Sequence, residues 1–132
     1  MQVVSPIDVE NALRIDLSTL FANTYRVYCK PIRQDLAAGD VVIYPLGGAR
    51  VSGASHDYDV SIDCYAADDA LARSMVNEVH GACVSLPLRS TQTQYSNVNA
   101  NLPYSNYDPR SPQLTRYTFR ATITSPGQRL TF

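Results

Sequence analysis

The stretch from residue 57 to residue 86 constrains the fold most, because a strand pattern passes there almost directly into a helix pattern. Apolar and mostly polar residues alternate over residues 57–66, and a period of two is typical of a strand with one buried face. Asp68 follows at a position expected for a helix N-cap, and apolar residues then recur at three- and four-residue spacing as far as Leu86. The short connection predicts that this strand and this helix cover each other.

The rest of the chain predicts one more helix and three more strands. The helix is expected over residues 6–21 and the strands over residues 25–29, 41–44 and 115–124. Ser5, with Pro6 after it, is the expected N-cap of that helix. The apolar run that begins at Val41 is typical of a central strand covered on both faces; Pro45 is expected to limit it, and the glycines of residues 47–53 to form a turn. We therefore predict an α+β fold: a mainly antiparallel sheet of about four strands with two helices packed on one face.

Length and charge limit the classes of protein to consider. The 132 residues suffice for one domain, expected over residues 1–132, that buries a core without disulfides or a metal. The formal net charge of −1 argues against a non-specific nucleic-acid binder, which needs a clustered positive surface. It does not exclude a ring through which DNA passes.

Cysteine usage and the lack of targeting signals indicate a compartment. Cys29, Cys64 and Cys83 have no CxxC spacing, and the last two fall on apolar faces, which predicts buried free thiols. The first residues lack the pattern of a signal peptide, and no apolar stretch approaches the ~20 residues of a membrane helix. We expect a reducing cytoplasm and no membrane partner.

An acidic row forms the first candidate site. Asp57, Asp59 and Asp63 project from one face of the strand at residues 57–66. One interpretation is cross-strand pairing with Arg116 and Arg120 on the polar face of the last strand. The other is an acidic patch facing solvent or the lumen of a ring. A metal site would need more convergent ligands than one strand face supplies.

The segment over residues 88–114 forms the second candidate site. It is expected to be an extended loop, with a possible short strand near residues 91–98, and long loops in compact domains tend to be functional. Its tyrosines, Tyr95, Tyr104 and Tyr107, predict contacts with another subunit or a partner, because tyrosine is enriched at interfaces. The alternative is a loop folded on its own domain.

No residue pattern indicates catalysis or a cofactor. The glycines at 47 and 48 are followed by neither the Lys of a phosphate-binding loop nor a helix, so a turn is the better interpretation. His56 and His80 have no base–orienter partner in the sequence pattern. We predict no catalytic, cofactor-binding or metal-binding residue, and no enzymatic activity.

The order of elements and several local motifs resemble the tail terminator, or tail completion, proteins of long-tailed bacteriophages. The resemblance rests on the capped N-terminal helix, the run of residues 41–44 followed by Leu46-Gly47-Gly48, and the strand His56-Asp57-Tyr58-Asp59-Val60-Ser61-Ile62-Asp63-Cys64-Tyr65-Ala66. It continues through the helix led by Asp68, the loop with Tyr107-Asp108-Pro109-Arg110 and the final alternating strand, and so spans nearly the whole chain.

The resemblance implies a structural virion protein that is assembled in the host cytoplasm. Such proteins form a ring, usually a hexamer, that caps the head-proximal end of the tail tube, stops its polymerisation and joins it to the neck. The implied partners are copies of the same chain, the tail tube protein and a neck or head-closure protein, with genomic DNA passing through the lumen without specific binding. Arg110 joins the tyrosines as a candidate contact residue. Two alternatives remain: another head–tail connector or head-closure protein, and a small α+β enzyme or ligand-binding domain.

Overall fold

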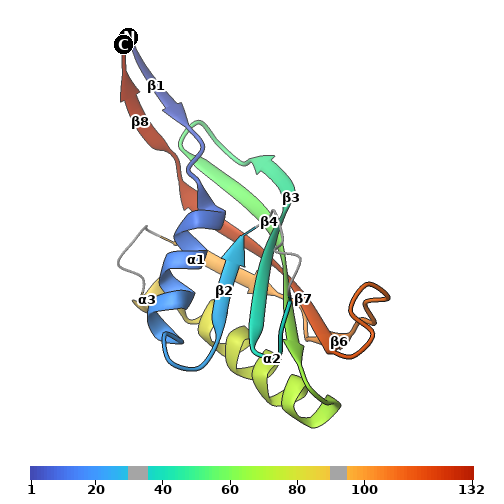
Figure 1. Ribbon diagram of the computed structural model, residues 1–132. Helices are drawn as coiled ribbons and strands as arrows, with labels where there is room; N and C mark the ends of the chain where they lie inside the picture. The colour runs from blue at the N-terminus through green and yellow to red at the C-terminus, as the bar shows by residue number, and fades with distance from the viewer. Residues whose placement is uncertain (30–35, 90–94) are drawn as a thin grey trace.

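A computed structural model of the chain describes residues 1–29, 36–89 and 95–132 (Figure 1). In chain order the elements are β1 (Gln2–Ser5), α1 (Val9–Leu20), β2 (Arg26–Cys29), β3 (Asp40–Arg50), β4 (Ser55–Ala66), α2 (Asp69–Val84), α3 (Leu86–Arg89), β5 (Asn97–Ala100), β6 (Tyr104–Ser105), β7 (Thr115–Pro126) and β8 (Gln128–Thr131). The predicted α+β class is confirmed. The strand count is larger than about four.

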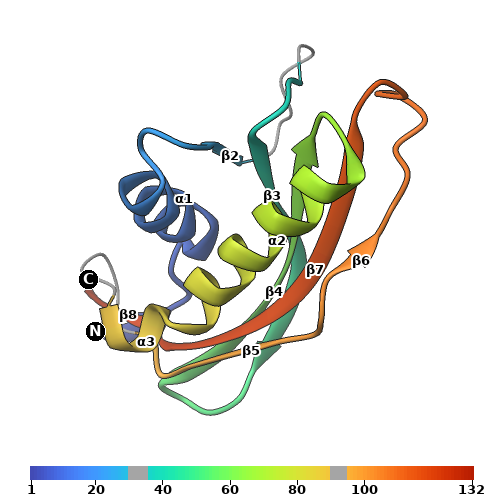
Figure 2. The same cartoon turned by 90° about the horizontal axis from the view of Figure 1, so that it is seen from below.

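The main sheet has the order β2-β3-β4-β7-β5, and β6 also pairs with β7. Among the pairings of the described strands in this sheet, β2–β3 is parallel and the others are antiparallel. Helices α1 and α2 lie on the same face of this curved sheet (Figure 2), as predicted. Their apolar residues close one core with alternate residues of the central strands. Its fully buried members include Leu13, Leu17, Val41, Ile43, Ile62, Cys64, Val79 and Phe119.

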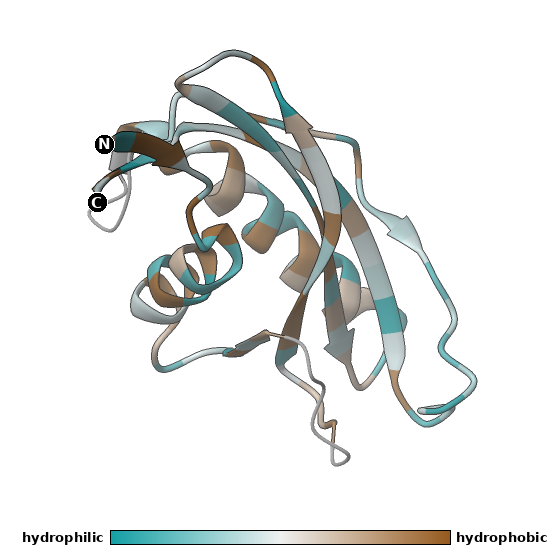
Figure 3. Ribbon diagram, turned by 90° about the horizontal axis from the view of Figure 1, so that it is seen from above, coloured by the Kyte–Doolittle hydropathy of each residue, from teal (hydrophilic) through white to brown (hydrophobic). Residues whose placement is uncertain are grey.

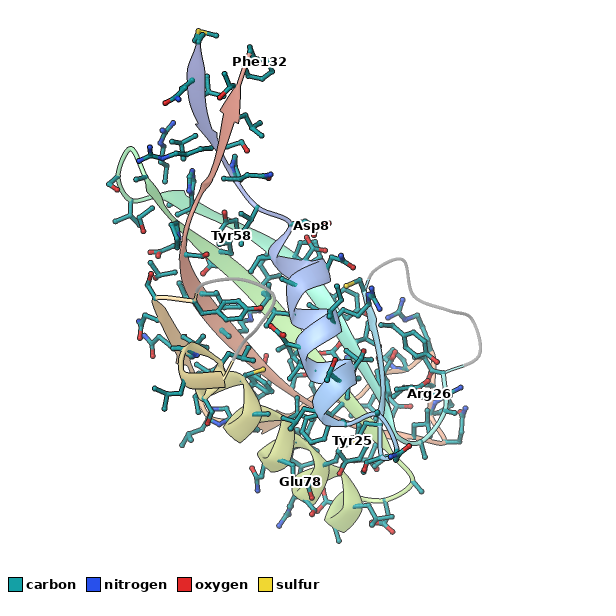
Figure 4. The ribbon with its side chains drawn as sticks, turned by 90° about the vertical axis from the view of Figure 1, so that its left-hand side faces the viewer. Asp8, Tyr25, Arg26, Tyr58, Glu78 and Phe132 are labelled. Carbon is teal, nitrogen blue, oxygen red and sulfur yellow. The ribbon has the colours of Figure 1, made fainter. Side chains whose placement is uncertain are left out.

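The strand–helix unit forms as the sequence predicts. Asp68 is the N-cap of α2, and its Oδ1 accepts a hydrogen bond of 2.9 Å from the backbone N–H of Leu71. The helix then packs against β4 and β7, which places Cys64 and Cys83 in the core as buried free thiols. Tyr25, just before β2, is tied to the same helix, because its hydroxyl donates to Glu78 Oε2 at 2.9 Å (Figure 4).

The start of the first helix differs from the prediction. Its N-cap is Asp8, whose Oδ1 accepts from the backbone N–H of Asn11 at 3.1 Å, and Ser5 lies in β1. Ser5 pairs there with Gln128, so its backbone is committed to a strand and the helix begins at Val9. The entry to the helix is fixed instead by Tyr58, whose hydroxyl accepts from the backbone N–H of Ile7 at 2.9 Å (Figure 4).

Strands β1 and β8 were not predicted, and they form a separate two-stranded sheet. We call this ribbon, residues 1–5 and 128–132, the arm. It extends away from the body of the domain with both chain ends at its tip (Figure 1). Each strand is only four residues long and pairs with the opposite end of the chain, so no local pattern marks it.

Strand β3 continues past Pro45, contrary to the prediction. Within the described residues, β2 pairs with β3 as far as Ile43, so Pro45 lies beyond the last of these pairs, where its missing N–H interrupts none of them. The register with β4 shifts between Pro45 and Gly47, and the strand then runs to Arg50. The predicted turn is correspondingly shorter, and Val51 closes it by donating its N–H to the Ser55 carbonyl at 3.0 Å.

In the segment over residues 88–114, the described residues contain more regular structure than the predicted extended loop. Helix α3 contains Pro87 and runs to Arg89, and residues 90–94 lie outside the described parts of the chain. Strands β5 and β6 then both pair with β7. The possible strand at residues 91–98 thus overlaps β5 only at Asn97 and Val98. The asparagines of β5 alternate with half-buried Val98 and Ala100, a pattern too short and polar to predict a strand.

Candidate interaction surface

A buried charged cluster fixes the chain that enters β7. We call Asp63, Asp108 and Arg116 the anchor cluster. Arg116 Nη1 lies 3.6 Å from Asp63 Oδ2 and 3.6 Å from Asp108 Oδ2, and all three side chains are largely buried. Tyr65 adds a hydrogen bond of 3.0 Å from its hydroxyl to Asp108 Oδ2. One guanidinium thus balances two carboxylates that burial would otherwise make costly.

Arg116 also holds the backbone of the preceding segment. Its Nε donates to the Asn106 carbonyl at 2.7 Å and its Nη2 to the Tyr107 carbonyl at 3.1 Å. Asp108 accepts from the backbone N–H of Arg110 at 3.0 Å, and Arg110 Nε lies 3.3 Å from the same carboxylate. Residues 106–110 are therefore fixed against the end of the sheet by charge-assisted hydrogen bonds.

The two carboxylates of the anchor cluster are shifted in opposite directions. Burial raises the pKa of Asp63 above its ordinary value, although the Thr118 hydrogen bond and Arg116 oppose the shift. Burial also acts to raise the pKa of Asp108, but hydrogen bonds from Arg110 and Tyr65, together with the charge of Arg116, hold this pKa below its ordinary value. The ionised form of Asp108 therefore stabilises the folded state, whereas the ionised form of Asp63 is costly.

These directions predict opposite pH dependences for two matched variants. A lowered folded pKa stabilises the fold above the unfolded pKa of about 3.9, and this contribution is lost as the pH falls through the folded value. The stability of the wild type relative to Asp108→Asn should therefore shrink between about pH 5 and about pH 3. Relative to Asp63→Asn it should grow as the pH falls, because the ionised form of Asp63 is the costly one. Urea unfolding across this range measures both differences, and parallel changes would contradict the assignment.

Threonines of β7 are the nearest partners of the acidic row. The hydroxyls of Thr124, Thr122 and Thr118 donate to Asp57, Asp59 and Asp63 at 2.5, 2.6 and 2.8 Å. Each pair joins residues that lie opposite each other in the β4–β7 register. Of the two arginines proposed as partners, Arg116 lies by Asp63. Arg120 stands opposite Ser61, is exposed, and forms no ion pair with the row within the described residues.

The tyrosines of the second candidate site fall into two groups. Tyr95 is only 5 % exposed and donates its hydroxyl to Asp16 Oδ2 at 3.0 Å, so it packs inside its own domain. Tyr104 and Tyr107 are 39 % and 66 % exposed, and Leu102, which the sequence analysis did not single out, is 80 % exposed. The Arg110 side chain is also mostly exposed, with its Nε against Asp108. We call Leu102, Tyr104 and Tyr107 the apolar strip; in Figure 3 it belongs to an otherwise largely hydrophilic segment beside β7.

The histidines are placed in structural settings. His56 is buried beside Tyr58, with ring centroids 6.1 Å apart. His80 Nε2 lies 3.0 Å from the Asn101 carbonyl, and its ring meets the edge of Phe119. Within the described residues, no group of three or more His, Cys, Asp or Glu side chains could hold a metal ion. None of the helices in those same parts of the chain is long and apolar enough to span a membrane.

Comparison with known proteins gives likenesses among solved structures. No protein-family model and no curated protein matches the chain. Among solved structures, the chain is similar to one described as "Virion of native gene transfer agent (GTA) particle", with a TM-score of 0.58 and 21 % sequence identity. The match covers 90 % of this chain and 92 % of that chain. The two chains therefore share a fold over nearly their whole lengths.

Proposed function

We propose that this protein is a structural component of a phage-like virion and acts through assembly rather than catalysis. The observation that carries the proposal is the whole-length likeness to a chain of a gene transfer agent virion. The fold likeness agrees with the resemblance of the sequence to tail terminator proteins, which rests on local motifs. Fold alone does not define function, so the more detailed role has to be argued from the surface.

In this role, copies of the chain form a ring, a hexamer, that caps the head-proximal end of the tail tube and joins it to the neck. The apolar strip supports such a role, because exposed apolar and aromatic residues on a rigid segment favour association. The anchor cluster fixes that segment in advance, which lowers the entropy cost of docking. Duplex DNA passes through the ring without specific binding, in keeping with the net charge of −1.

Tube growth provides the functional test. Tail tube protein of the same particle is polymerised with and without this chain, and tube lengths are measured by electron microscopy. We expect short tubes that carry density at one end. Unchanged lengths with no end density would contradict the capping role, and binding to portal-side proteins in place of tube protein would indicate a different neck component.

The apolar strip should matter in this assay. The double variant Leu102→Ser/Tyr107→Ser is expected to fold normally, because both side chains are exposed. It should need at least about tenfold more protein for the same degree of capping, which corresponds to a loss of ~1.4 kcal/mol of binding free energy. The matched control is Leu71→Ser/Leu88→Ser, which removes two exposed leucines from the helical side. Equal loss in both double variants would show that the strip has no particular role.

A further inference from the structure

The segment that carries the apolar strip takes no part in the hydrophobic core. Residues 102–114, which we call the strap, follow β5, include β6 and lead into β7, and the structure describes all of them. Ala100 before the strap and Tyr117 after it pack against the core cluster, but no residue of the strap does. Figure 2 shows the strap beyond β7, at the edge of the sheet. Few buried apolar contacts are typical of segments that open at low cost.

Both ends of the strap are held independently of its middle. At the first end, the Asn101 N–H donates to the Arg120 carbonyl at 3.1 Å, and Asn101 Oδ1 accepts from the Arg120 N–H at 2.7 Å. At the other end, Thr115 pairs with Ala66 in the β4–β7 register. Each end can therefore stay in place while the middle moves, as the hinges of a mobile segment do.

Polar contacts attach the middle of the strap to the sheet, and they meet at the anchor cluster. Arg116 in β7 and Tyr65 in β4 both contact the Asp108 carboxylate. Arg116 also bonds the carbonyls of Asn106 and Tyr107. The Asn106 N–H returns a bond of 2.9 Å to the Arg116 carbonyl. Because the same few residues make these bonds, loss of the anchor cluster would release the middle of the strap in one step.

The strap covers buried side chains on the face of the sheet opposite the helices. Tyr65 is fully buried but is not a member of the core cluster, whereas its neighbour Cys64 is. Successive side chains of β4 point to opposite faces, so Tyr65 lies on the face away from the helices. Its hydroxyl meets Asp108 of the strap, and Asp63 and Thr118 are buried on the same face. An open strap would therefore uncover these side chains and leave the core closed.

We propose that the strap opens as one unit while the rest of the domain stays folded, with Asn101 and Thr115 as its hinges. The anchor cluster holds the closed state, which prevails and keeps the apolar strip in a fixed position beside β7. Opening carries the strip away, and it uncovers Tyr65 and the edge of β7 at residues 117–118. This inference goes beyond the proposed assembly, because it concerns the single chain.

Native-state hydrogen exchange tests the proposal, because an amide that exchanges through opening of the strap does not respond to the stability of the core. Leu13→Ala removes a fully buried side chain of α1, so global unfolding should become at least about tenfold more frequent. The amide of Ile62 in β4 should then exchange faster by that factor. The amides of Tyr104 and Asn106, which join the strap to β7, should keep their wild-type rates.

Two matched tyrosine substitutions test the role of the anchor cluster. Tyr65→Phe keeps the ring and removes the hydroxyl that bonds Asp108, so the amides of Tyr104 and Asn106 should both exchange at least about tenfold faster. Tyr107→Phe changes an exposed tyrosine of the strap and should leave both rates as they are in the wild type. Equal rates in the two variants would contradict the role of the Tyr65 contact in closing the strap.

Exchange that follows the core would overturn the proposal. If Leu13→Ala speeds the exchange of Asn106 by the same factor as that of the core, the strap opens only when the whole domain unfolds. Unequal responses of Tyr104 and Asn106 to Tyr65→Phe would show that the strap does not open as one unit. Ile43→Val, a milder change in the same core, replaces Leu13→Ala if that variant fails to fold, with an expected effect of about threefold on the core amides. None of these results bears on whether the chain forms a ring.

Discussion

Replacing Arg116 with Met is expected to destabilise the protein by about 3–5 kcal/mol, the range for removing one member of a buried ion pair. The methionine keeps the volume but removes the buried cation that lies between Asp63 and Asp108; Asp108 then retains its contact with the exposed Arg110. The substitution also frees the carbonyls of Asn106 and Tyr107. Urea unfolding should show a lower midpoint, and amide exchange should speed up first in residues 106–110.

Arg120→Met is the matched control, since Arg120 lies on the same strand and is exposed. Its stability should stay within about 0.5 kcal/mol of the wild type. The double variant Arg116→Met/Asp108→Asn should recover part of the lost free energy of unfolding, because it also removes one of the two carboxylates that Arg116 contacts. Equal effects of Arg116→Met and Arg120→Met would show that the anchor cluster does not hold the segment.

Replacing Gly48 with Ala is expected to cost roughly 2–4 kcal/mol, the sum of backbone strain and overpacking. Gly48 has φ +155°, and an added Cβ would lie 2.0 Å from the carbonyl oxygen of Asp57 and 3.0 Å from its carbonyl carbon. Both contacts are with backbone of the paired strand, so relief requires the β3–β4 hairpin to separate. Chemical denaturation measures the loss.

Gly53→Ala is the control for this substitution, because a Cβ at Gly53 meets no atom within 4 Å. It should be neutral or stabilising by up to about 1 kcal/mol, through the lower entropy of the unfolded chain. If Gly48→Ala proved equally neutral, the close approach of β3 and β4 after the register shift would not exist in solution.

The parts of the fold that the sequence predicts are those with local periodicity. The alternation before Ala66 and the spacing after Asp68 predict β4 and α2, and the run from Val41 predicts the buried start of β3. The arm could not be predicted this way, because it pairs the two ends of the chain through strands of four residues each. The same pairing takes Ser5 away from the expected helix start, although its residue type suits an N-cap.

In the candidate sites, too, local patterns could be predicted and contacts between distant segments could not. The acidic row is visible from alternation alone, and its threonine partners could have been found, because Thr118, Thr122 and Thr124 share the polar face of the last strand. Contacts between segments far apart in the sequence could not have been found in this way. Nothing local shows that Tyr65 donates to Asp108 or that Tyr95 reaches Asp16, and these bonds decide which tyrosines stay exposed.

The mass and shape of the purified particle show most directly whether this chain assembles with its own copies. Light scattering, followed by negative-stain electron microscopy, should find a closed ring of six 14.6 kDa subunits with a central hole wide enough for duplex DNA. A protein that stays a monomer at every concentration and turns over a small molecule would contradict the claim that this chain works by assembling with its own copies.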